Sequence, residues 1–498
     1  MQAEQHNKES FRDTIATVDE SGKRRWVYPK QPAGRYYEWR TYVSYLLLIV
    51  LFGLPWIRVG GEPLFLFDVL SRKFILFGLS FTPQDFHLFA LMMITGMVFI
   101  ILFTAVFGRL FCGWVCPQTI FMEMVFRKIE YWIEGDGNAQ KRLAKAPWSA
   151  EKARKKIFKH GLFILVAAVI AHTFLAYIIG TDRLLTTVTQ SPLDAPGGFL
   201  AIIVFIALFY GVFAYMREQV CIAICPYGRL QGVLLDRDSI NVIYDYERGE
   251  PRGKLSKRKD KPKRTACDSC ESCREKGGAC SDRMLENMQA SLTSLEEPRK
   301  GDCIDCTLCV QVCPTGIDIR NGIQMECVNC TACIDACDAV MDKIDRPRGL
   351  IRYDSENGVS NRKRHIWTSR VMAYSGLLVA LIALNIVLLS GRESLDVLLL
   401  RASGQLYHTE ADGTITNLYT YQVINKTGEE LPLTFAAEEG SRAQVELVGG
   451  SQPVAKPGEV TEGVLFIRWL GDDYPDKVTI TVTSERGQQV LTTSFLHP

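Results

Sequence analysis

Five long apolar stretches constrain this chain most, because a helix of about 20 apolar residues is what a bilayer core requires. They cover residues 42–57, 86–107, 161–180, 198–215 and 371–390. The first is the shortest and contains Pro55, although Trp39 and Trp56 flank it as interfacial anchors. We therefore expect a membrane α-helical bundle of five spans. The residues before the first span are polar and charged, so no cleaved signal peptide is expected.

The positive charges predict how the spans are oriented. Lys and Arg gather in the N-terminal segment, in the loop after the second span and in the segment RGEPRGKLSKRKDKPKR after the fourth, whereas the third–fourth loop has only Arg183. Positive charge marks the cytoplasmic side, so the N-terminus is expected on the cytoplasmic side of the membrane and the C-terminus on the outer side. Arg58, Arg72 and Lys73 weaken this bias without reversing it. The basic run at 248–264 is interpreted as a solvated linker, with anionic membrane lipid as the alternative partner.

The cysteines support this orientation independently. All sixteen lie on the predicted cytoplasmic side or at its membrane edge, and the exported C-terminal region has none. Because thiols stay reduced in the cytosol, clustered cysteines there indicate metal or redox chemistry rather than a disulfide framework.

One cytoplasmic segment, GDCIDCTLCVQVCPTGIDIRNGIQMECVNCTACIDACD, contains two C-x2-C-x2-C-x3-C runs. This is the spacing of two-cluster ferredoxins, in which the fourth cysteine of each run ligates the other cluster. It predicts two [4Fe-4S] clusters. The first would be held by Cys303, Cys306, Cys309 and Cys337, and the second by Cys327, Cys330, Cys333 and Cys313. Zinc or disulfides are the disfavoured alternatives, because the eight cysteines are in duplicated register.

A further group lies upstream, in ACDSCESCREKGGAC. It contains Cys267, Cys270, Cys273 and Cys280, but its last gap is longer and no proline follows. Four thiols suit a third cluster or a structural zinc site. A basic linker whose thiols bind metal only adventitiously is an equal alternative.

A second cysteine pattern recurs where two pairs of spans end. RLFCGWVCPQ contains Cys112 and Cys116, and VCIAICPYGR contains Cys221 and Cys225, each pair followed by proline. The repeat predicts two helical hairpins that bring four thiols to the cytoplasmic face of the membrane. Thiolates are soft ligands that select Cu(I), zinc or iron–sulfur clusters, so the four are candidate catalytic and metal-binding residues. Core packing is the competing interpretation.

The C-terminal region predicts a different kind of domain. TNLYTYQVIN, EGVLFIRW and DKVTITVTSE alternate in hydrophobicity between turn signals. About 100 residues of this pattern predict an all-β immunoglobulin-like sandwich, with a scaffold or docking role. The expected boundaries of the whole chain are 1–41, 42–217 for four spans, 218–366 for linker and ferredoxin domain, 367–391 for the fifth span and 392–498. His172 lies inside the third span and most simply satisfies a local hydrogen bond.

These motifs together resemble the FixG/CcoG (RdxA) family, the accessory proteins for assembly of cbb3-type cytochrome c oxidase. Matching stretches run along almost the whole chain and include GLPWIR, TPQDF, GRLFCGWVCPQT, REQVC, CPYGR, RGEPRGK, GDCIDCTLCVQVCPTGIDIRNG and PRGLIRY. The resemblance implies a membrane cupric reductase that supplies Cu(I), with the paired CxxxCP thiols as the copper site. It also implies oxidase assembly factors and copper-handling proteins as partners. Residues 265–300 look like an insertion relative to the family, so their cysteines inherit no role.

Two other functions stay open from the sequence. One is an electron-transfer polyferredoxin subunit between quinol and a partner enzyme, and the other is a non-redox scaffold for oxidase assembly. The sequence shows no nucleotide, flavin or haem motif, so the electron donor is expected to be a separate molecule. It predicts no nucleic-acid partner and leaves a homodimer open.

Overall fold

The fold is that of a computed structural model, in which the chain divides into two compact units. The first comprises Met1–Leu47, Ile100–Ile164 and Tyr210–Ala373, and the second comprises Leu48–Phe99, Leu165–Phe209 and Tyr374–Pro498. The structure describes residues 16–18, 21–59, 61–69, 73–81, 85–254, 300–361, 365–391, 395–402, 407–410, 413–427, 429–438, 440–449, 452–456, 460–471 and 473–498.

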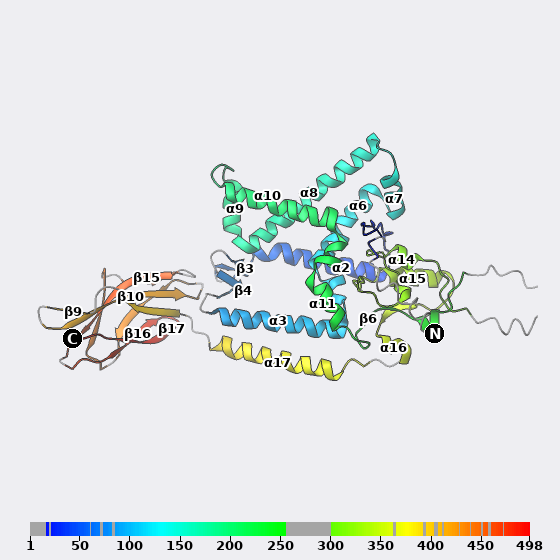
Figure 1. Ribbon diagram of the computed structural model, residues 1–498. Helices are drawn as coiled ribbons and strands as arrows, with labels where there is room; N and C mark the ends of the chain where they lie inside the picture. Colours follow the sequence, from blue (N-terminus) through cyan, green and yellow to red (C-terminus); the bar gives the residue numbers. More distant parts are fainter. Residues whose placement is uncertain are drawn as a thin grey trace, which may run out of the picture. The chain divides into compact units, whose positions relative to one another are not determined.

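Five helices of the described chain are long and apolar enough to cross a membrane, which confirms the predicted bundle (Figure 1). They are α2 (Arg35–Gly53), α3 (Phe86–Phe107), α8 (Ala150–Ile179), α10 (Pro196–Gly211) and α17 (Ser369–Ser390). Four begin earlier than hydropathy predicted, α10 and α17 by two residues, α2 by seven and α8 by eleven. Hydropathy identifies only the part of a helix that is apolar enough for lipid. The helix itself continues into water wherever its polar residues form hydrogen bonds or ion pairs.

Buried ion pairs explain the early start of α8. Lys159 on α8 lies 2.9 Å from Glu134, and Lys156 lies 2.8 Å from the same carboxylate. Glu134 belongs to α6 (Arg127–Glu134), which precedes α7 (Gly137–Lys145). Although burial opposes its ionisation, Arg217 and Lys159 hold the pKa of Glu130 below its ordinary value. The first turns of α8 are thus bound to α6 by charges that a hydropathy scan counts as polar.

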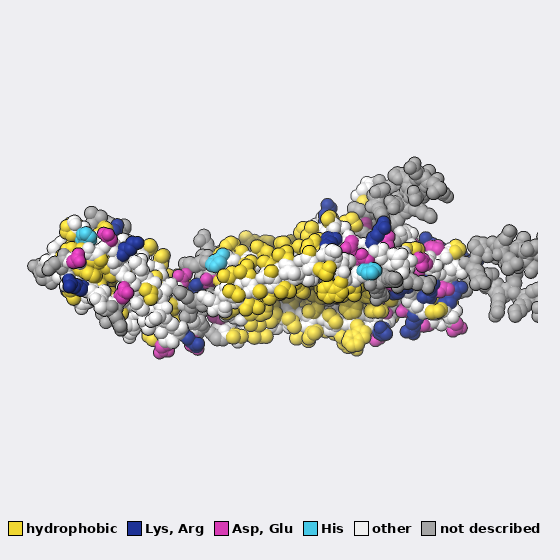
Figure 2. All heavy atoms as spheres, turned by 90° about the horizontal axis from the view of Figure 1, so that it is seen from below, with side chains coloured by type: hydrophobic (Ala, Val, Ile, Leu, Met, Phe, Trp, Pro, Cys, Tyr) yellow, Lys and Arg dark blue, Asp and Glu magenta, His cyan; other side chains and the backbone are white. Residues whose placement is uncertain are grey.

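The long helices expose apolar side chains outward (Figure 2). Met93, Ile203, Val379 and Ile386 are each more than half exposed, which suits a surface that lipid covers. Polar side chains turn inward instead. In the second unit, Asn385 on α17 donates a hydrogen bond of 2.8 Å to the hydroxyl of Thr95 on α3.

Short elements surround each of the two CxxxCP pairs. The first run contains α4 (Leu110–Trp114), α5 (Pro117–Ile120) and the π-helix η4 (Phe121–Phe126). The second contains the π-helices η5 (Val212–Met216) and η6 (Val220–Ile224) and the helix α11 (Pro226–Leu234). Single π turns are uncommon and occur often at functional sites.

The cysteine-rich segment folds around two short helices and a two-stranded sheet. Helix α14 (Leu308–Gln311), η7 (Ile319–Asn321) and α15 (Ala332–Lys343) pack on β6 (Asn241–Tyr244), which pairs antiparallel with β7 (Ile351–Asp354). Val242, Ile334, Met341, Leu350 and Ile351 form the core of this segment. Helices α12 (Tyr246–Gly249) and α16 (Glu356–Asn361) flank the sheet strands in sequence.

The second unit contains all the remaining elements. Helix α9 (Thr181–Thr189) follows α8, and η2 (Leu54–Trp56) follows α2. Strands β1 (Arg58–Val59) and β2 (Glu62–Pro63) pair with each other, and β3 (Phe65–Asp68), β4 (Lys73–Leu76) and β5 (Leu79–Phe81) form a small antiparallel sheet.

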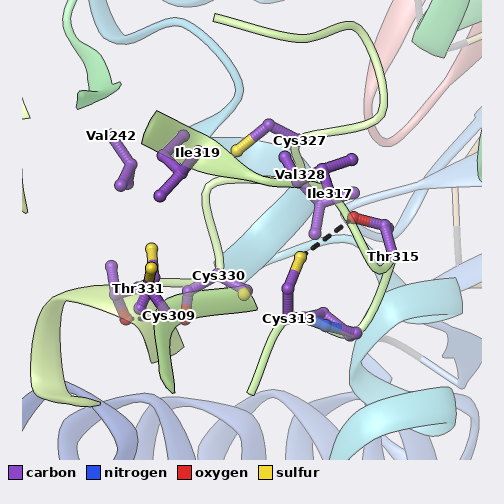
Figure 3. A pocket seen from close by; sticks show the side chains of 12 residues that line it. Val242, Cys309, Cys313, Thr315, Ile317, Ile319, Cys327, Val328, Cys330 and Thr331 are labelled. Carbon is purple, nitrogen blue, oxygen red and sulfur yellow. Dashed lines mark hydrogen bonds between the residues drawn. The ribbon is translucent and has the colours of Figure 1, made fainter. Parts of the chain in front are cut away.

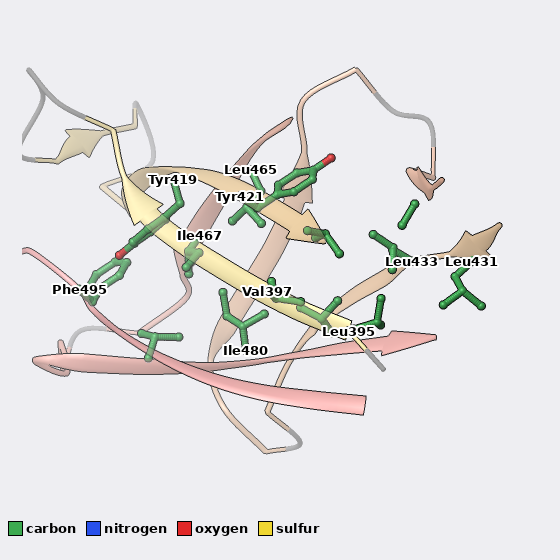
Figure 4. Close-up of a cluster of buried hydrophobic side chains, with 14 of the residues drawn as sticks. Leu395, Val397, Tyr419, Tyr421, Leu431, Leu433, Leu465, Ile467, Ile480 and Phe495 are labelled. Atoms are coloured by element: carbon green, nitrogen blue, oxygen red, sulfur yellow. The ribbon is translucent and has the colours of Figure 1, made fainter. Parts of the chain in front are cut away.

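The C-terminal residues form the expected immunoglobulin-like β domain. One sheet has the order β13-β15-β10-β8 with β9 beside β10, another has the order β12-β16-β17, and β11 pairs with β14. The strands are β8 (Leu395–Arg401), β9 (His408–Thr409), β10 (Ile415–Asn425), β11 (Leu431–Pro432), β12 (Thr434–Ala437), β13 (Ala443–Leu447), β14 (Val454–Ala455), β15 (Val460–Trp469), β16 (Lys477–Ser484) and β17 (Gly487–Ser494). Alternate side chains of both sheets, among them Tyr419, Ile467 and Ile480, fill one core (Figure 4).

Candidate metal centres

Two enclosed cavities divide the eight ferredoxin-type cysteines between them. The first cavity is lined by Cys303, Cys306, Cys309 and Cys337 with apolar neighbours such as Met341 and Leu350. The second is lined by Cys313, Cys327, Cys330 and Cys333, with Cys309 at its margin and Ile317, Ile319 and Val328 around it (Figure 3). This division is the exchanged grouping that the spacing predicts, in which each run sends its fourth cysteine to the other set.

A repeated backbone conformation wraps the chain around each cavity. The residues on both sides of the middle cysteine are left-handed in each run: Asp305 (φ 53°) and Thr307 (φ 58°) flank Cys306, and Asn329 (φ 52°) and Thr331 (φ 65°) flank Cys330. Residues with side chains adopt this conformation at a cost, so two such pairs indicate a strong local requirement. The turns let three thiols within seven residues face one cavity.

Helix α15 joins the two cavities. Cys333 lines the second cavity and Cys337 lines the first, and the two are four residues apart on one helix face. Burial raises the pKa of both Cys337 and Cys327 to about 12. Without a cation these thiols are neutral, and a bound metal would displace their protons. Enclosed apolar cavities with four soft donors each therefore fit iron–sulfur clusters.

The four CxxxCP thiols form a second group, which we call the thiol quartet: Cys112, Cys116, Cys221 and Cys225. In each motif the helix is interrupted at the second cysteine, because Cys116 and Cys225 are extended N-cap residues before Pro117 and Pro226. Each thiol of the quartet interacts electrostatically with the other three. The structure thus brings together two pairs that lie more than a hundred residues apart in sequence.

The four thiols of the quartet are partly buried. Burial raises the pKa of Cys112 to about 11 and that of Cys221 to about 12. The amide of Gln231, a fully buried side chain, donates a hydrogen bond of 3.2 Å to the sulfur of Cys112. Within the described ranges, no three His, Cys, Asp or Glu side chains have the geometry of a preformed single-ion site.

Direct backbone contact joins the quartet to the second cavity. The buried Arg109 guanidinium donates to the carbonyl oxygens of Cys327 (3.3 Å) and Gly228 (3.2 Å). Gly113, between the first two quartet cysteines, lies against the loop so closely that a Cβ there would overlap the backbone of Val328 and Asn329. Helix α4 thus packs on the loop that contains Cys327 and Cys330.

Three further hydrogen bonds hold this contact in place. Arg40 donates through Nε to the carbonyl oxygen of Gly113 at 2.7 Å. Trp114 donates to the hydroxyl of Tyr353, which itself donates to the carbonyl oxygen of Asn329. Sequence reasoning missed all of these residues. The only signal for them in the sequence was Gly113, which lies between Cys112 and Cys116. The corresponding position of the second CxxxCP motif is Ile222.

The other candidate residues of the sequence are a further cysteine group and one histidine. Cys267, Cys270, Cys273 and Cys280 lie outside the described residues. His172 has its Nδ1 2.7 Å from the carbonyl oxygen of Ala168 on its own helix, which is the local hydrogen bond expected from its position.

Comparison with known proteins supports the iron–sulfur assignment. A family model described as a 4Fe-4S dicluster domain matches residues 216–282 and 269–356, and a 4Fe-4S binding domain matches 89–135. The model for the IG-like fold at the C-terminal of FixG matches 385–498. With its five apolar helices, the chain is a multi-pass membrane iron–sulfur protein with an oxidoreductase-like character.

Three curated relatives match most of the chain. Protein RdxB of Cereibacter sphaeroides is 34% identical, covering 82% of this chain and 80% of the relative. Nitrogen fixation protein FixG of Rhizobium meliloti is 30% identical, covering 94% of this chain and 88% of the relative. Protein RdxA of Cereibacter sphaeroides is 32% identical, covering 86% of each. Identity at this level over nearly the full length shows that the chain belongs to the FixG/RdxA family.

Proposed function

We propose that this protein reduces Cu(II) to Cu(I) at the thiol quartet and so supports copper delivery to, and assembly of, a cbb3-type cytochrome c oxidase. The observation that carries this proposal is the contact of α4 with the loop of Cys327 and Cys330. This contact supports electron transfer between the two groups, because it packs the helix of Cys112 on the loop that lines a cavity suited to an iron–sulfur cluster.

The lining of the two cavities supports two sets of cluster ligands. Cys303, Cys306, Cys309 and Cys337 hold one [4Fe-4S] cluster, and Cys313, Cys327, Cys330 and Cys333 hold the other. When bound, such clusters supply electrons one at a time. Cys306 is exposed whereas Cys303 and Cys309 are buried, so the first cavity is the one that opens towards solvent.

The quartet supplies the chemistry for copper. Thiolates stabilise Cu(I) over Cu(II), so the site favours the reduced ion. Cu(II) takes up one electron to give Cu(I), and the thiols lose protons as they become ligands. Thiols alone would become disulfides after one round, so repeated turnover needs electrons from elsewhere in the protein. Arg109 interacts electrostatically with Cys112 and favours its thiolate form.

The proposed sidedness places this chemistry in the cytoplasm. The Lys and Arg distribution and the location of all sixteen cysteines support a cytoplasmic N-terminus and cluster segment, with the β domain in the periplasm. Copper-handling proteins and oxidase assembly factors would be its partners.

The test uses protein purified anaerobically with its clusters. Dithionite-reduced protein, freed of excess reductant, should turn Cu(II) into Cu(I), trapped by a Cu(I)-specific chelator, while the cluster absorption returns. Replacing Cys112 and Cys116 by Ala should keep the cluster absorption and abolish copper reduction. Full copper reduction by this variant at unchanged cluster content would refute the proposal, and clusters that do not change with reductant would favour a scaffold.

One observation favours a second function for the quartet. The 4Fe-4S binding model matches residues 89–135, where Cys112 and Cys116 are the only cysteines. The quartet would then hold a further cluster, and the protein would pass electrons to a partner without binding copper. Iron analysis separates the two functions in a variant with Cys267, Cys270, Cys273 and Cys280 replaced by Ser. About eight iron per chain supports the copper site, and about twelve supports the additional cluster.

A further inference from the structure

An open pocket with an aromatic lining lies beside the cluster segment in the first unit. Its volume is about 660 Å³, within the range of about 300–1,000 Å³ that is typical of small-molecule sites. We call it the tyrosine pocket. It is lined by Gln31, Tyr37, Glu38, Thr41, Tyr42, Tyr45, Lys128, Tyr131 and Trp132.

Two helices build this pocket with regular spacing. Tyr37, Thr41 and Tyr45 repeat every four residues along α2, and Lys128, Tyr131 and Trp132 share one face of α6 (Figure 1). Helix α2 is one of the five candidate spans, and Tyr42 and Trp132 are 67% and 73% exposed. Tyr and Trp gather where a bilayer meets water, so a lipid-soluble molecule can reach the pocket from the membrane.

The polar groups of the pocket suit an uncharged aromatic ligand. Lys128 Nζ lies 3.5 Å from the Thr41 hydroxyl and 3.4 Å from that of Tyr45, and it lies over the Tyr37 and Tyr45 rings. Among the described residues that line the pocket, Glu38 is the one acid and balances the one cation. A lipid phosphate would call for several cations, whereas a ring with two oxygens needs donors, acceptors and aromatic faces.

The wall of the pocket is bonded to the helix that joins both cluster cavities. The backbone N–H groups of Tyr36 and Tyr37 donate to the two carboxylate oxygens of Asp335, at 3.1 and 2.8 Å. Asp335 is buried on α15, two residues from Cys333 and two from Cys337. Gly34 lies directly against Asp335 in the same contact, because a Cβ at position 34 would be only 2.5 Å from Asp335 Cβ. Tyr37 therefore both lines the pocket and contacts the cluster segment.

We propose that the tyrosine pocket binds a membrane quinol, and that this quinol is the electron donor of the protein. The inference rests on the proposed function, because it names the donor for copper reduction. One quinol and two Cu(II) give one quinone, two Cu(I) and two protons. The Lys128 ammonium donates a hydrogen bond to a quinol oxygen, and Glu38 at the open side takes up a proton for release to water.

The test compares two reductants on the same protein in lipid nanodiscs. A short-chain quinol should reduce the clusters, seen as loss of their visible absorption, and should drive Cu(II) reduction. Lys128→Met keeps the length of the side chain and removes its charge. It should weaken quinone binding about tenfold, measured by quenching of tryptophan fluorescence, and should slow quinol-driven cluster reduction to a similar degree. Dithionite-driven copper reduction should be unchanged.

Lys155→Met is the matched control, because Lys155 forms an ion pair with Glu151 on α8 and does not line the pocket. It should behave as the parent protein does. If dithionite drives copper reduction but quinol reduces no cluster, the quinol proposal is wrong and the proposed function stands. If dithionite-reduced clusters fail to reduce copper, the proposed function fails. Quinol reduction with equal rates in parent and Lys128→Met would place the donor site elsewhere and overturn this assignment.

Discussion

The guanidinium of Arg109 donates a hydrogen bond to the carbonyl oxygen of Cys327, across an N–O distance of 3.3 Å. This contact joins a residue at the end of a membrane helix to a cysteine of the ferredoxin-type segment, 218 positions later in the chain. Because Arg109 also interacts electrostatically with Cys112, one buried cation lies beside both cysteine groups. The contact therefore links the thiol quartet to the loop of Cys327 and Cys330.

Removing the charge of Arg109 should lower the reduction potential of the cluster held by Cys313, Cys327, Cys330 and Cys333. A buried cation stabilises the added electron, so Arg109→Met should shift the potential by about −50 to −100 mV. Redox titration followed by electron paramagnetic resonance measures the shift. Arg109→Lys keeps the charge and should stay much closer to the parent value. Equal potentials in all three proteins would mean that Arg109 only supports the fold.

Gly113→Ala should separate the quartet from the cluster loop. The added Cβ would overlap the backbone of Val328 and Asn329, so either α4 or the loop must shift, at a cost of about 1–3 kcal/mol. We expect Cu(II) to reoxidise the clusters more slowly, measured by stopped-flow absorbance. Gly161→Ala is the matched control, because a Cβ there meets nothing within 4 Å. A fast, parent-like reaction in Gly113→Ala would argue against electron passage through this contact.

Cys112 and Cys221 of the quartet should react slowly and with a steep dependence on pH. The thiolate is the nucleophile, and burial raises the pKa of Cys112 to about 11 and that of Cys221 to about 12. Well below these values, each unit of pH should raise the alkylation rate about tenfold, and at pH 8 the rate should be at least a hundredfold below that of free cysteine. Iodoacetamide labelling read by peptide mass spectrometry checks this. A plateau near pH 9 would mean that the thiols ionise as exposed groups do.

Fusion reporters test the sidedness of the chain. A reporter joined after Pro498 should be active only in the periplasm, and one inserted after Lys259 only in the cytoplasm, because positive loops stay inside. The opposite pattern would reverse the orientation and leave the clustering of cysteines on one side without a chemical reason.

Much of this architecture could be predicted from the sequence, because it depends on local patterns. A bilayer excludes unpaired backbone groups, so long apolar runs such as 86–107 predict helices with nearly the right ends. The spacing of Cys303 to Cys313 and of Cys327 to Cys337 also predicts a division into two sets, and the structure groups the thiols in that way. The alternation of apolar and polar side chains along β10 and β15 was enough to predict the β domain.

Only the tertiary structure decided what lies beside these motifs. The Arg109–Cys327 bond, the fit of Gly113 and the capping of α2 by Asp335 each join residues at least 70 positions apart. The early start of α8 depends on Glu130 and Glu134 in another helix. Hydropathy and cysteine spacing describe the environment and the ligands that suit one segment. These contacts depend instead on how separate segments pack. The sequence alone therefore determined which groups the protein can hold, and packing determined which of them lie close enough to act together.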